Sequence, residues 1–120
     1  MTTKEVATMV ASIGIPYAYY QFPEGTEQSC PFICFFFSSS DDLVADNTNY
    51  QPIRQLSIEL YTDDKDYTTE ATVETTLNTS GLVYSREETY LGSERMYMVT
   101  YTTEIVITEE NNNVNTNEQS

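Results

Sequence analysis

The chain has 120 residues and a formal net charge of −14, with 19 acidic residues against five basic ones. This length fits one domain with a single hydrophobic core, and so few cations exclude a surface that grips nucleic acid through its phosphates. There is no His, which excludes a Ser–His hydrolase. We expect an intracellular, soluble protein, because no run approaches the ~20 apolar residues that span a bilayer and the opening stretch lacks the apolar core of a signal peptide.

The first half of the chain predicts one helix and two strands. Thr2 and Glu5 have the spacing of a capping box, and apolar residues follow at helical intervals up to a Gly-Ile-Pro stop. Residues 17–22 and 32–38 are rich in β-forming residues. The second of these runs is continuously apolar, which favours a strand buried on both faces. Residues 38–52 are too polar for a core element, and loops of this length are usually functional or disordered.

The second half predicts a strand, a helix and a hairpin. Apolar and polar side chains alternate in residues 54–62, so we expect one face of this strand to be buried. Residues 82–92 and 95–109 should pair as a hairpin with a turn near Leu-Gly-Ser-Glu. The last strand is expected to be the longest and to lie centrally, with Thr102 on its outward face. Its inward face, packed on both helices, should consist of Tyr97, Val99, Tyr101, Ile105 and Ile107.

These elements follow one another in the order α-β-β-β-α-β-β. Because the strands are mostly joined by hairpin-length links, this order predicts an α+β fold with a mostly antiparallel sheet packed by two helices. Residues 1–109 would form this single domain. Residues 110–120 are an Asn-rich C-terminal tail that we expect to be disordered.

Five carboxylates between Asp63 and Glu74 raise the question of a metal or catalytic site. A calcium-binding EF-hand loop opening at Asp64 fails, because it would place Thr where a glycine and a bidentate Glu are needed. A catalytic acid pair needs environments that separate the two pKa values, whereas we expect these acids on one exposed turn. We favour Asp64 or Asp66 as the cap of a helix beginning near Tyr67. The sequence therefore predicts no catalytic residue, no cofactor and no metal site.

Two other groups of side chains invite a functional interpretation. Tyr17, Tyr19 and Tyr20 could stack on nucleic-acid bases, but no Lys or Arg is interleaved with them. They indicate instead a half-buried strand surface or a subunit contact. Cys30 and Cys34 are expected to be small, reduced core or edge residues, since zinc would need further ligands from a chain without His.

The polar segment 38–52 also carries three apolar residues among its aspartates. A loop that served a monomer alone would have little reason to expose them, so we predict that this segment reaches onto an adjacent subunit. The predicted subunit interface consists of Asp41, Asp42, Leu43, Val44, Asp46, Tyr50, Tyr17 and Tyr19.

The order of these signals resembles that of a known family. A helix ending in "GIP" precedes an aromatic strand and "FPEG", then "PFICFFF" and "ADNTNY". "IELYTDDKD" leads into "EATVETTLNTSG", and "REETYLGSERMYMVTYTTEI" ends the body. Over residues 1 to about 109 the chain resembles the tail terminator or tail-completion (tail-to-head joining) proteins of long-tailed phages and prophages of Gram-positive bacteria.

The resemblance implies a structural role in a virion. Such subunits form a homo-oligomer, a hexameric ring, which caps the finished tail tube protein and meets the head-tail connector protein. It implies a place in the tail or neck of the virion after assembly in the host cytoplasm, and no catalytic residues. DNA would pass through the ring without specific binding, and an acidic lumen would let it slide. Acidic surfaces also keep proteins soluble, so the charge has a second explanation.

Three alternatives stay open at this point. A neck adaptor, a head-tail connector protein one layer nearer the head, fits the same signals. An acidic DNA mimic would need carboxylates spaced like phosphates on one face, whereas those here are scattered over strand faces and loops. An enzyme is the third class, and no motif in the sequence supports it.

Overall fold

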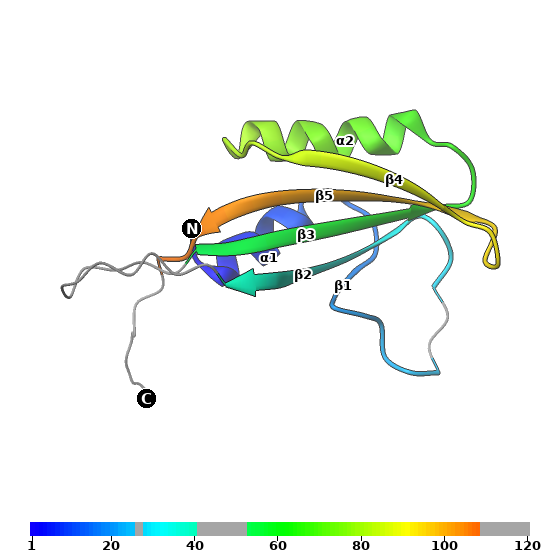
Figure 1. Cartoon of the computed structure of the whole chain (residues 1–120), viewed down its shortest axis with the longest axis horizontal. Coiled ribbons are helices and arrows are strands. Elements are labelled where there is room, and N and C mark those ends of the chain that lie inside the picture. The colour runs from blue at the N-terminus through cyan, green and yellow to red at the C-terminus, as the bar shows by residue number, and fades with distance from the viewer. Residues whose placement is uncertain (26–27, 41–52, 109–120) are drawn as a thin grey trace.

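The computed structural model describes residues 1–25, 28–40 and 53–108 (Figure 1). It confirms the predicted α+β class and the order α-β-β-β-α-β-β. The predicted loop at 41–52 and the tail at 110–120 lie outside the described residues. The elements are α1 (Thr3–Ala11), β1 (Tyr17–Tyr19), β2 (Phe32–Ser40), β3 (Ile53–Thr62), α2 (Tyr67–Thr79), β4 (Ser85–Leu91) and β5 (Met96–Val106).

The five strands form one mixed sheet in the order β1-β2-β3-β5-β4. β3 is antiparallel to β2 and β5, and β4 is antiparallel to β5, whereas β1 runs parallel to β2. β5, with 11 residues, is the longest of the described strands, as predicted. As expected, β5 lies inside the sheet with a partner on each side, β3 and β4, although β3 is the middle strand of the five.

Both helices contribute to one hydrophobic core against the same face of the sheet. In Figure 1, α1 lies behind the strands and α2 runs beside β4. The helices are neighbours, since Thr8 and Met9 of α1 line a hollow together with Thr75 and Thr76 of α2. The alternation predicted for β3 and β5 is confirmed, because their predicted apolar positions face the helices, with Thr62 and Thr103 as buried polar residues among them. Fully or almost fully buried members of this core are Val6, Val10, Leu56, Ile58, Leu60, Val73, Leu77, Val99, Tyr101 and Ile105.

Both helices begin with the caps that the sequence predicts. The Thr2 hydroxyl accepts a hydrogen bond from the Glu5 N–H at 3.0 Å, and the Glu5 carboxylate accepts one from the Thr2 N–H at 2.8 Å. At α2 the cap is Asp66, whose carboxylate accepts from the Thr69 hydroxyl at 2.6 Å and the Thr69 N–H at 3.1 Å. These bonds favour the ionised form and hold the pKa of Asp66 below its ordinary value.

Threonines crowd α2 and lower its intrinsic helix propensity. Two of their hydroxyls donate hydrogen bonds to the backbone carbonyl four residues earlier: Thr72 to Thr68 at 3.1 Å, and Thr76 to Thr72 at 2.9 Å. Such back-bonding is weakly destabilising in a helix. The helix is therefore held mainly by burial of Val73 and Leu77 against the sheet.

The strand predicted at residues 17–22 is shorter than expected. β1 ends at Tyr19, because Tyr20 adopts a left-handed backbone with φ of 73° and the chain leaves the sheet there. The Tyr20 N–H still donates to the Phe35 carbonyl at 2.8 Å. The Tyr19 ring contacts Phe35 on the helix side, and the Tyr20 ring contacts Phe36 on the other side, as the alternation of neighbouring strand residues requires. At the margin of the sheet the two tyrosine rings still meet edge-on, with centroids 6.2 Å apart.

The prediction that the apolar run at 32–38 is buried on both faces is confirmed only in part, at Cys34 on the face away from the helices. Ile33 and Phe35 are buried beneath the helices, whereas Phe32 and Phe36 on the other face are only partly buried. Within the described chain, no helix covers that second face. None of the described helices has the length and apolarity to cross a membrane.

Candidate functional site

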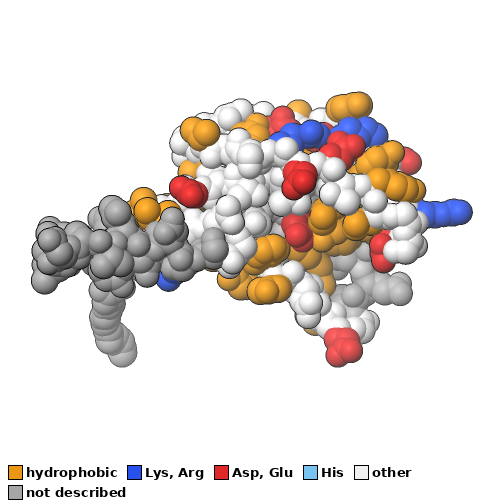
Figure 2. All heavy atoms as spheres, in the orientation of Figure 1, with side chains coloured by type: hydrophobic (Ala, Val, Ile, Leu, Met, Phe, Trp, Pro, Cys, Tyr) orange, Lys and Arg blue, Asp and Glu red, His pale blue; other side chains and the backbone are white. Residues whose placement is uncertain are grey.

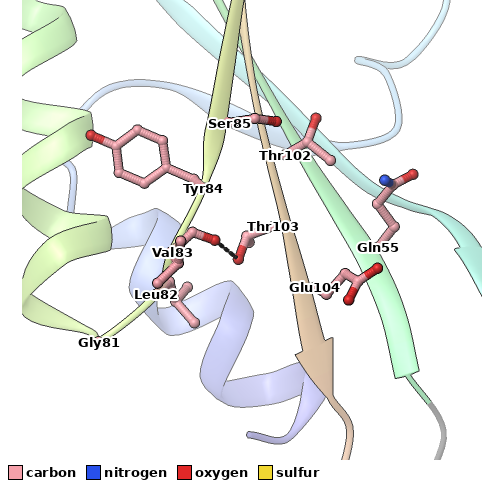
Figure 3. A pocket seen from close by; sticks show the side chains of 9 residues that line it. All are labelled: Gln55, Gly81, Leu82, Val83, Tyr84, Ser85, Thr102, Thr103 and Glu104. Carbon is pink, nitrogen blue, oxygen red and sulfur yellow. Dashed lines mark hydrogen bonds between the residues drawn. The ribbon is translucent and has the colours of Figure 1, made fainter. Parts of the chain in front are cut away.

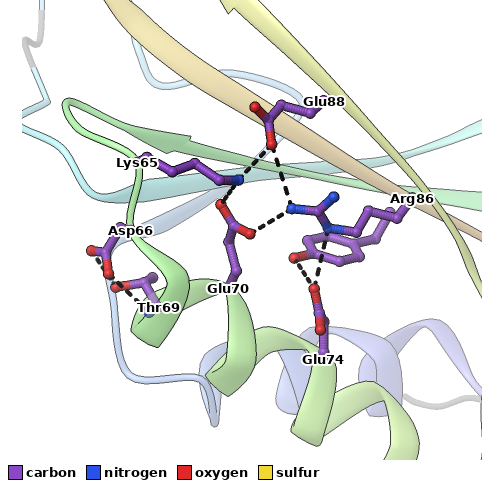
Figure 4. Close-up of polar contacts among 8 residues, drawn as sticks. Lys65, Asp66, Thr69, Glu70, Glu74, Arg86 and Glu88 are labelled. Atoms are coloured by element: carbon purple, nitrogen blue, oxygen red, sulfur yellow. Dashed lines mark hydrogen bonds and ion pairs between the residues drawn. The ribbon is translucent and has the colours of Figure 1, made fainter.

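The acidic segment around α2 forms an ion-pair cluster between the helix and the sheet (Figure 4). Glu70 is only 3% exposed, and its two carboxylate oxygens lie 2.5 Å from the Lys65 ammonium and 2.5 Å from the Arg86 guanidinium. Glu88 on β4 is 2.5 Å from the same ammonium and 3.5 Å from the same guanidinium. Two cations are thus shared by two carboxylates, which compensates the cost of burying Glu70.

A third carboxylate joins the cluster one turn later on α2. Glu74 accepts a hydrogen bond from the Tyr101 hydroxyl at 2.9 Å and lies 3.3 Å from the Arg86 Nε. Burial, together with the bond to Glu74, raises the pKa of Tyr101, so its hydroxyl stays protonated and donates. The cluster therefore connects α2 with both β4 and β5.

The expectation that the acids share one exposed turn was wrong for Glu70. Its burial depends on Arg86, 16 residues away in sequence, which the β4–β5 register brings over α2. The members of the cluster bond to one another, which suits a structural role. Among the described residues, no group of three Cys, Asp or Glu side chains is placed to hold a metal ion.

The two cysteines are both free. Burial, together with the neighbouring Asp63 carboxylate, raises the pKa of Cys30 to about 11, and burial also raises the pKa of Cys34. Since the thiolate is the nucleophilic form, both thiols are poor nucleophiles at neutral pH.

A hollow of about 620 Å³ lies where the chain enters β4 (Figure 3). The Thr103 hydroxyl donates to the Val83 carbonyl at 2.7 Å across its floor, and Glu104 stands at its rim. The other side chains around it are aliphatic, hydroxyl, phenol or amide groups. Among the described lining residues, the hydrogen bond is the one from Thr103 to the Val83 carbonyl, and none joins a hydroxyl to the Glu104 carboxylate.

The sheet face opposite the helices carries a cluster of stacked rings, which we call the aromatic patch: Tyr20, Phe22, Phe32, Phe36 and Tyr61. Ring centroids are 5.2 Å apart for Tyr20 and Phe36, 4.7 Å for Phe32 and Tyr61, and 5.6 Å for Phe22 and Phe32. Figure 2 shows hydrophobic side chains gathered over β2 and the neighbouring part of the sheet. Contiguous apolar side chains at the surface of a soluble protein often mark a site of contact with another molecule.

The remainder of the helix-free face is polar and acidic. Glu59 pairs with Thr100, and Thr100 pairs in turn with Glu87 across the neighbouring strands, so these side chains form one row. The Tyr61 hydroxyl donates to Glu59 at 2.7 Å, and burial with this bond raises the pKa of Tyr61. The helix-free face is thereby divided into an aromatic part and an acidic part.

Of the predicted interface residues, the structure describes Tyr17 and Tyr19. They are 43% and 53% exposed on β1, at one edge of the sheet. Both rings contact Phe35, on the helix side. The six predicted residues of the loop lie outside the described residues: Asp41, Asp42, Leu43, Val44, Asp46 and Tyr50. Sequence reasoning missed the aromatic patch, although the unbroken apolar run of β2 was a signal for it.

No family model and no curated protein matches the sequence. Among solved structures, the fold is similar to that of a chain in the virion of a native gene transfer agent (GTA) particle. The two chains are 13% identical, with a TM-score of 0.57, and the match covers 88% of this chain and 87% of the other. At this level of identity, the likeness shows a shared fold.

Proposed function

We propose that the chain is a structural protein of a virion, a tail terminator or tail-completion protein. It forms a ring that caps the phage tail tube and joins the tube to the head connector. The observation that carries this proposal is the likeness to the gene transfer agent chain, because it spans nearly the whole of both chains rather than one motif. The resemblance in residues 1 to about 109 supports the same class independently.

The described side chains suit contact rather than reaction. Glu70, Glu74 and Glu88 are engaged by cations or by the Tyr101 hydroxyl, and both thiols are held protonated. What the described surface offers are exposed rings, a free β4 edge and an acidic row. In a ring, Tyr17, Tyr19 and the loop at residues 41–50 would face the next subunit.

The acidic row gives the ring a physical way to pass DNA. If Glu59, Glu87 and Glu104 line the lumen, they repel the phosphates, so the strand slides and is not held. The DNA-mimic alternative has less support. It needs the carboxylates on one face, whereas Glu70 and Glu88 lie on the helix side of the sheet and are paired with cations.

A neck adaptor is the second candidate, because the matched chain belongs to a virion and the match does not say whether that chain lies in the tail or in the neck. Deleting the gene from a producing phage or prophage separates the two. Loss of a cap leaves the tube end open to further subunits, so we expect overlong tails that are not joined to heads. Loss of an adaptor should leave tails of normal length, also unjoined. Complete particles with normal tails would contradict both roles.

A further inference from the structure

A hollow of about 370 Å³ lies where β2 begins and where the chain passes from β3 to α2. It is lined by Cys30 and Pro31, just before β2, and by residues 62–66. Asp66 is fixed there as the cap of α2, and the Thr62 backbone pairs with Tyr97 at the end of β3. The segment that lines the hollow is therefore held by the fold at both of its ends.

Thr62 brings to this lining a buried hydroxyl that the fold does not use. The residue is 3% exposed, and its Oγ1 is the one buried side-chain oxygen or nitrogen of the described chain without a hydrogen-bond partner. Strand alternation places the side chain on the helix side with that of Leu60, and the segment 63–66 leads to α2 on that side. Buried hydroxyls are nearly always paired, and an unpaired one lowers stability. A ligand group that enters the hollow and bonds to Thr62 would account for it.

The charge around the hollow is negative and uncompensated. None of the ion pairs among the described residues includes Asp63 or Asp64. The neighbouring Cys30 thiol stays protonated, and its hydrogen bond to Asp63 adds no charge. Lys65 also belongs to the lining, but its ammonium is directed at Glu70 and Glu88, 2.5 Å from each (Figure 4).

These groups select the chemistry of a ligand. Two carboxylates repel an anion, whereas they and a hydroxyl oxygen together accept several hydrogen bonds. A bare metal ion is a poor match, because no three Cys, Asp or Glu side chains of the described chain are placed to hold one. The hollow is also about ten times larger than the roughly 30 Å³ that one water occupies. A polyatomic cation with several N–H donors suits both the charge and the space.

We propose that this hollow binds an organic cation, a guanidinium or primary ammonium group that donates to Asp63, Asp64 and the Thr62 hydroxyl. The group comes either from an Arg or Lys side chain of another protein or from a free amine. The chain itself has five basic residues and a net charge of −14, so it is a poor source of the cation. The inference goes beyond the proposed function and does not depend on ring assembly.

The test uses isothermal titration calorimetry on the purified full-length chain at low salt. The free probes are spermidine and agmatine, and a capped peptide with a single arginine between glycines represents a partner's side chain. The same peptide with citrulline, which keeps the shape and lacks the charge, is the neutral control. Thermal melting of every variant reports its stability.

Thr62→Val removes the unpaired hydroxyl and keeps the shape of the side chain. Thr103→Val is its matched control, because Thr103 is also buried on the helix side but donates to the Val83 carbonyl at 2.7 Å. Asp64→Asn removes one carboxylate of the site. Its control is Glu87→Gln, which removes one carboxylate from β4 on the helix-free face and so lowers the net charge equally.

We expect the cationic probes to bind and the citrulline peptide not to bind. Thr62→Val and Asp64→Asn should each weaken binding by about tenfold, because each removes an acceptor of a charged donor. Thr62→Val should melt at the same temperature as the natural chain or higher, whereas Thr103→Val should melt lower and bind normally. Glu87→Gln should also bind normally. Tighter binding of the arginine peptide than of the free amines would identify a partner's side chain as the source, and the reverse would identify a free amine.

Three results would overturn the proposal. The cationic probes could fail to bind, or bind no better than the citrulline peptide. Thr62→Val could bind as tightly as the natural chain, or Glu87→Gln could lose as much affinity as Asp64→Asn, which would indicate attraction to the acidic surface in general. Thr62→Val could also melt as low as Thr103→Val, which would show that the Thr62 hydroxyl serves the fold. Each of these results leaves the ring function untouched, because no readout depends on assembly.

Discussion

Replacing Glu70 with Gln tests whether the ion-pair cluster holds α2 on the sheet. The substitution keeps the shape and removes the charge that two cations share at 2.5 Å each. Hydrogen bonds to charged groups contribute roughly 1.5–3 kcal/mol each. The loss is smaller than two full bonds, because Lys65 and Arg86 are 23% and 35% exposed and both keep Glu88 as a partner. We expect Glu70→Gln to lower the free energy of unfolding by about 2–3 kcal/mol.

Glu74→Gln is the matched control for this experiment. It makes the same chemical change one turn later on the same helix, at a side chain that is 30% exposed. Partly solvated pairs contribute little, so we expect a loss of about 1 kcal/mol or less. Urea denaturation of the natural chain and the two variants measures both losses of unfolding free energy, provided that the free energy falls with urea concentration at the same slope in all three proteins. A Glu70→Gln variant as stable as the natural chain, or less affected than Glu74→Gln, would refute the reasoning.

The remaining predictions concern the core, the acidic turn, the loop and pH. Ile105→Ala should lower the free energy of unfolding by about 2–5 kcal/mol, because it leaves a cavity beneath the helices. Thr102→Ala, on the helix-free face, should lower it by less than about 1 kcal/mol. If chemical denaturation shows that Thr102→Ala is the more destabilising variant, the two faces of β5 have been assigned the wrong way round. Millimolar calcium should not raise the melting temperature, and a strong, saturable rise would reveal a site at residues 63–66. Deleting residues 41–49 should leave a folded monomer, and rings of unchanged size would exclude the loop from the interface. The pKa of Glu88 is lowered, chiefly by the hydrogen bond from Lys65. Ionised Glu88 should therefore contribute fully to the free energy of unfolding above the ordinary Glu pKa of 4.5, and this contribution should be lost as the pH falls through the lowered pKa. Urea denaturation at a series of acidic pH values measures this loss.

Local signals in the sequence were sufficient for most of the fold. The capping box at Thr2 and Glu5 and the alternation in β3 depend on residues close in the chain, and both are confirmed. The helix cap needed only the choice between two aspartates, and Asp66 is the one used. Such patterns are readable because one element fixes its own periodicity and its own first turn.

Features that depend on long-range pairing could not be predicted in the same way. The burial of Glu70 follows from Arg86 lying over α2, which requires the β4–β5 register. The central position of β3 depends on which side of β5 receives β4. The aromatic patch depends on the pairing of β2 with β1 and β3, which brings Phe36 to Tyr20 and Phe32 to Tyr61.

The most direct test of the central claim is a cryo-electron microscopy map of the complete phage particle, into which this fold is placed. We predict a hexameric ring of this chain at the head-proximal end of the tail tube, with Glu59 and Glu87 of the sheet toward the DNA path. A map in which the neck is fully accounted for by other chains, with this fold nowhere in the particle, would contradict the claim.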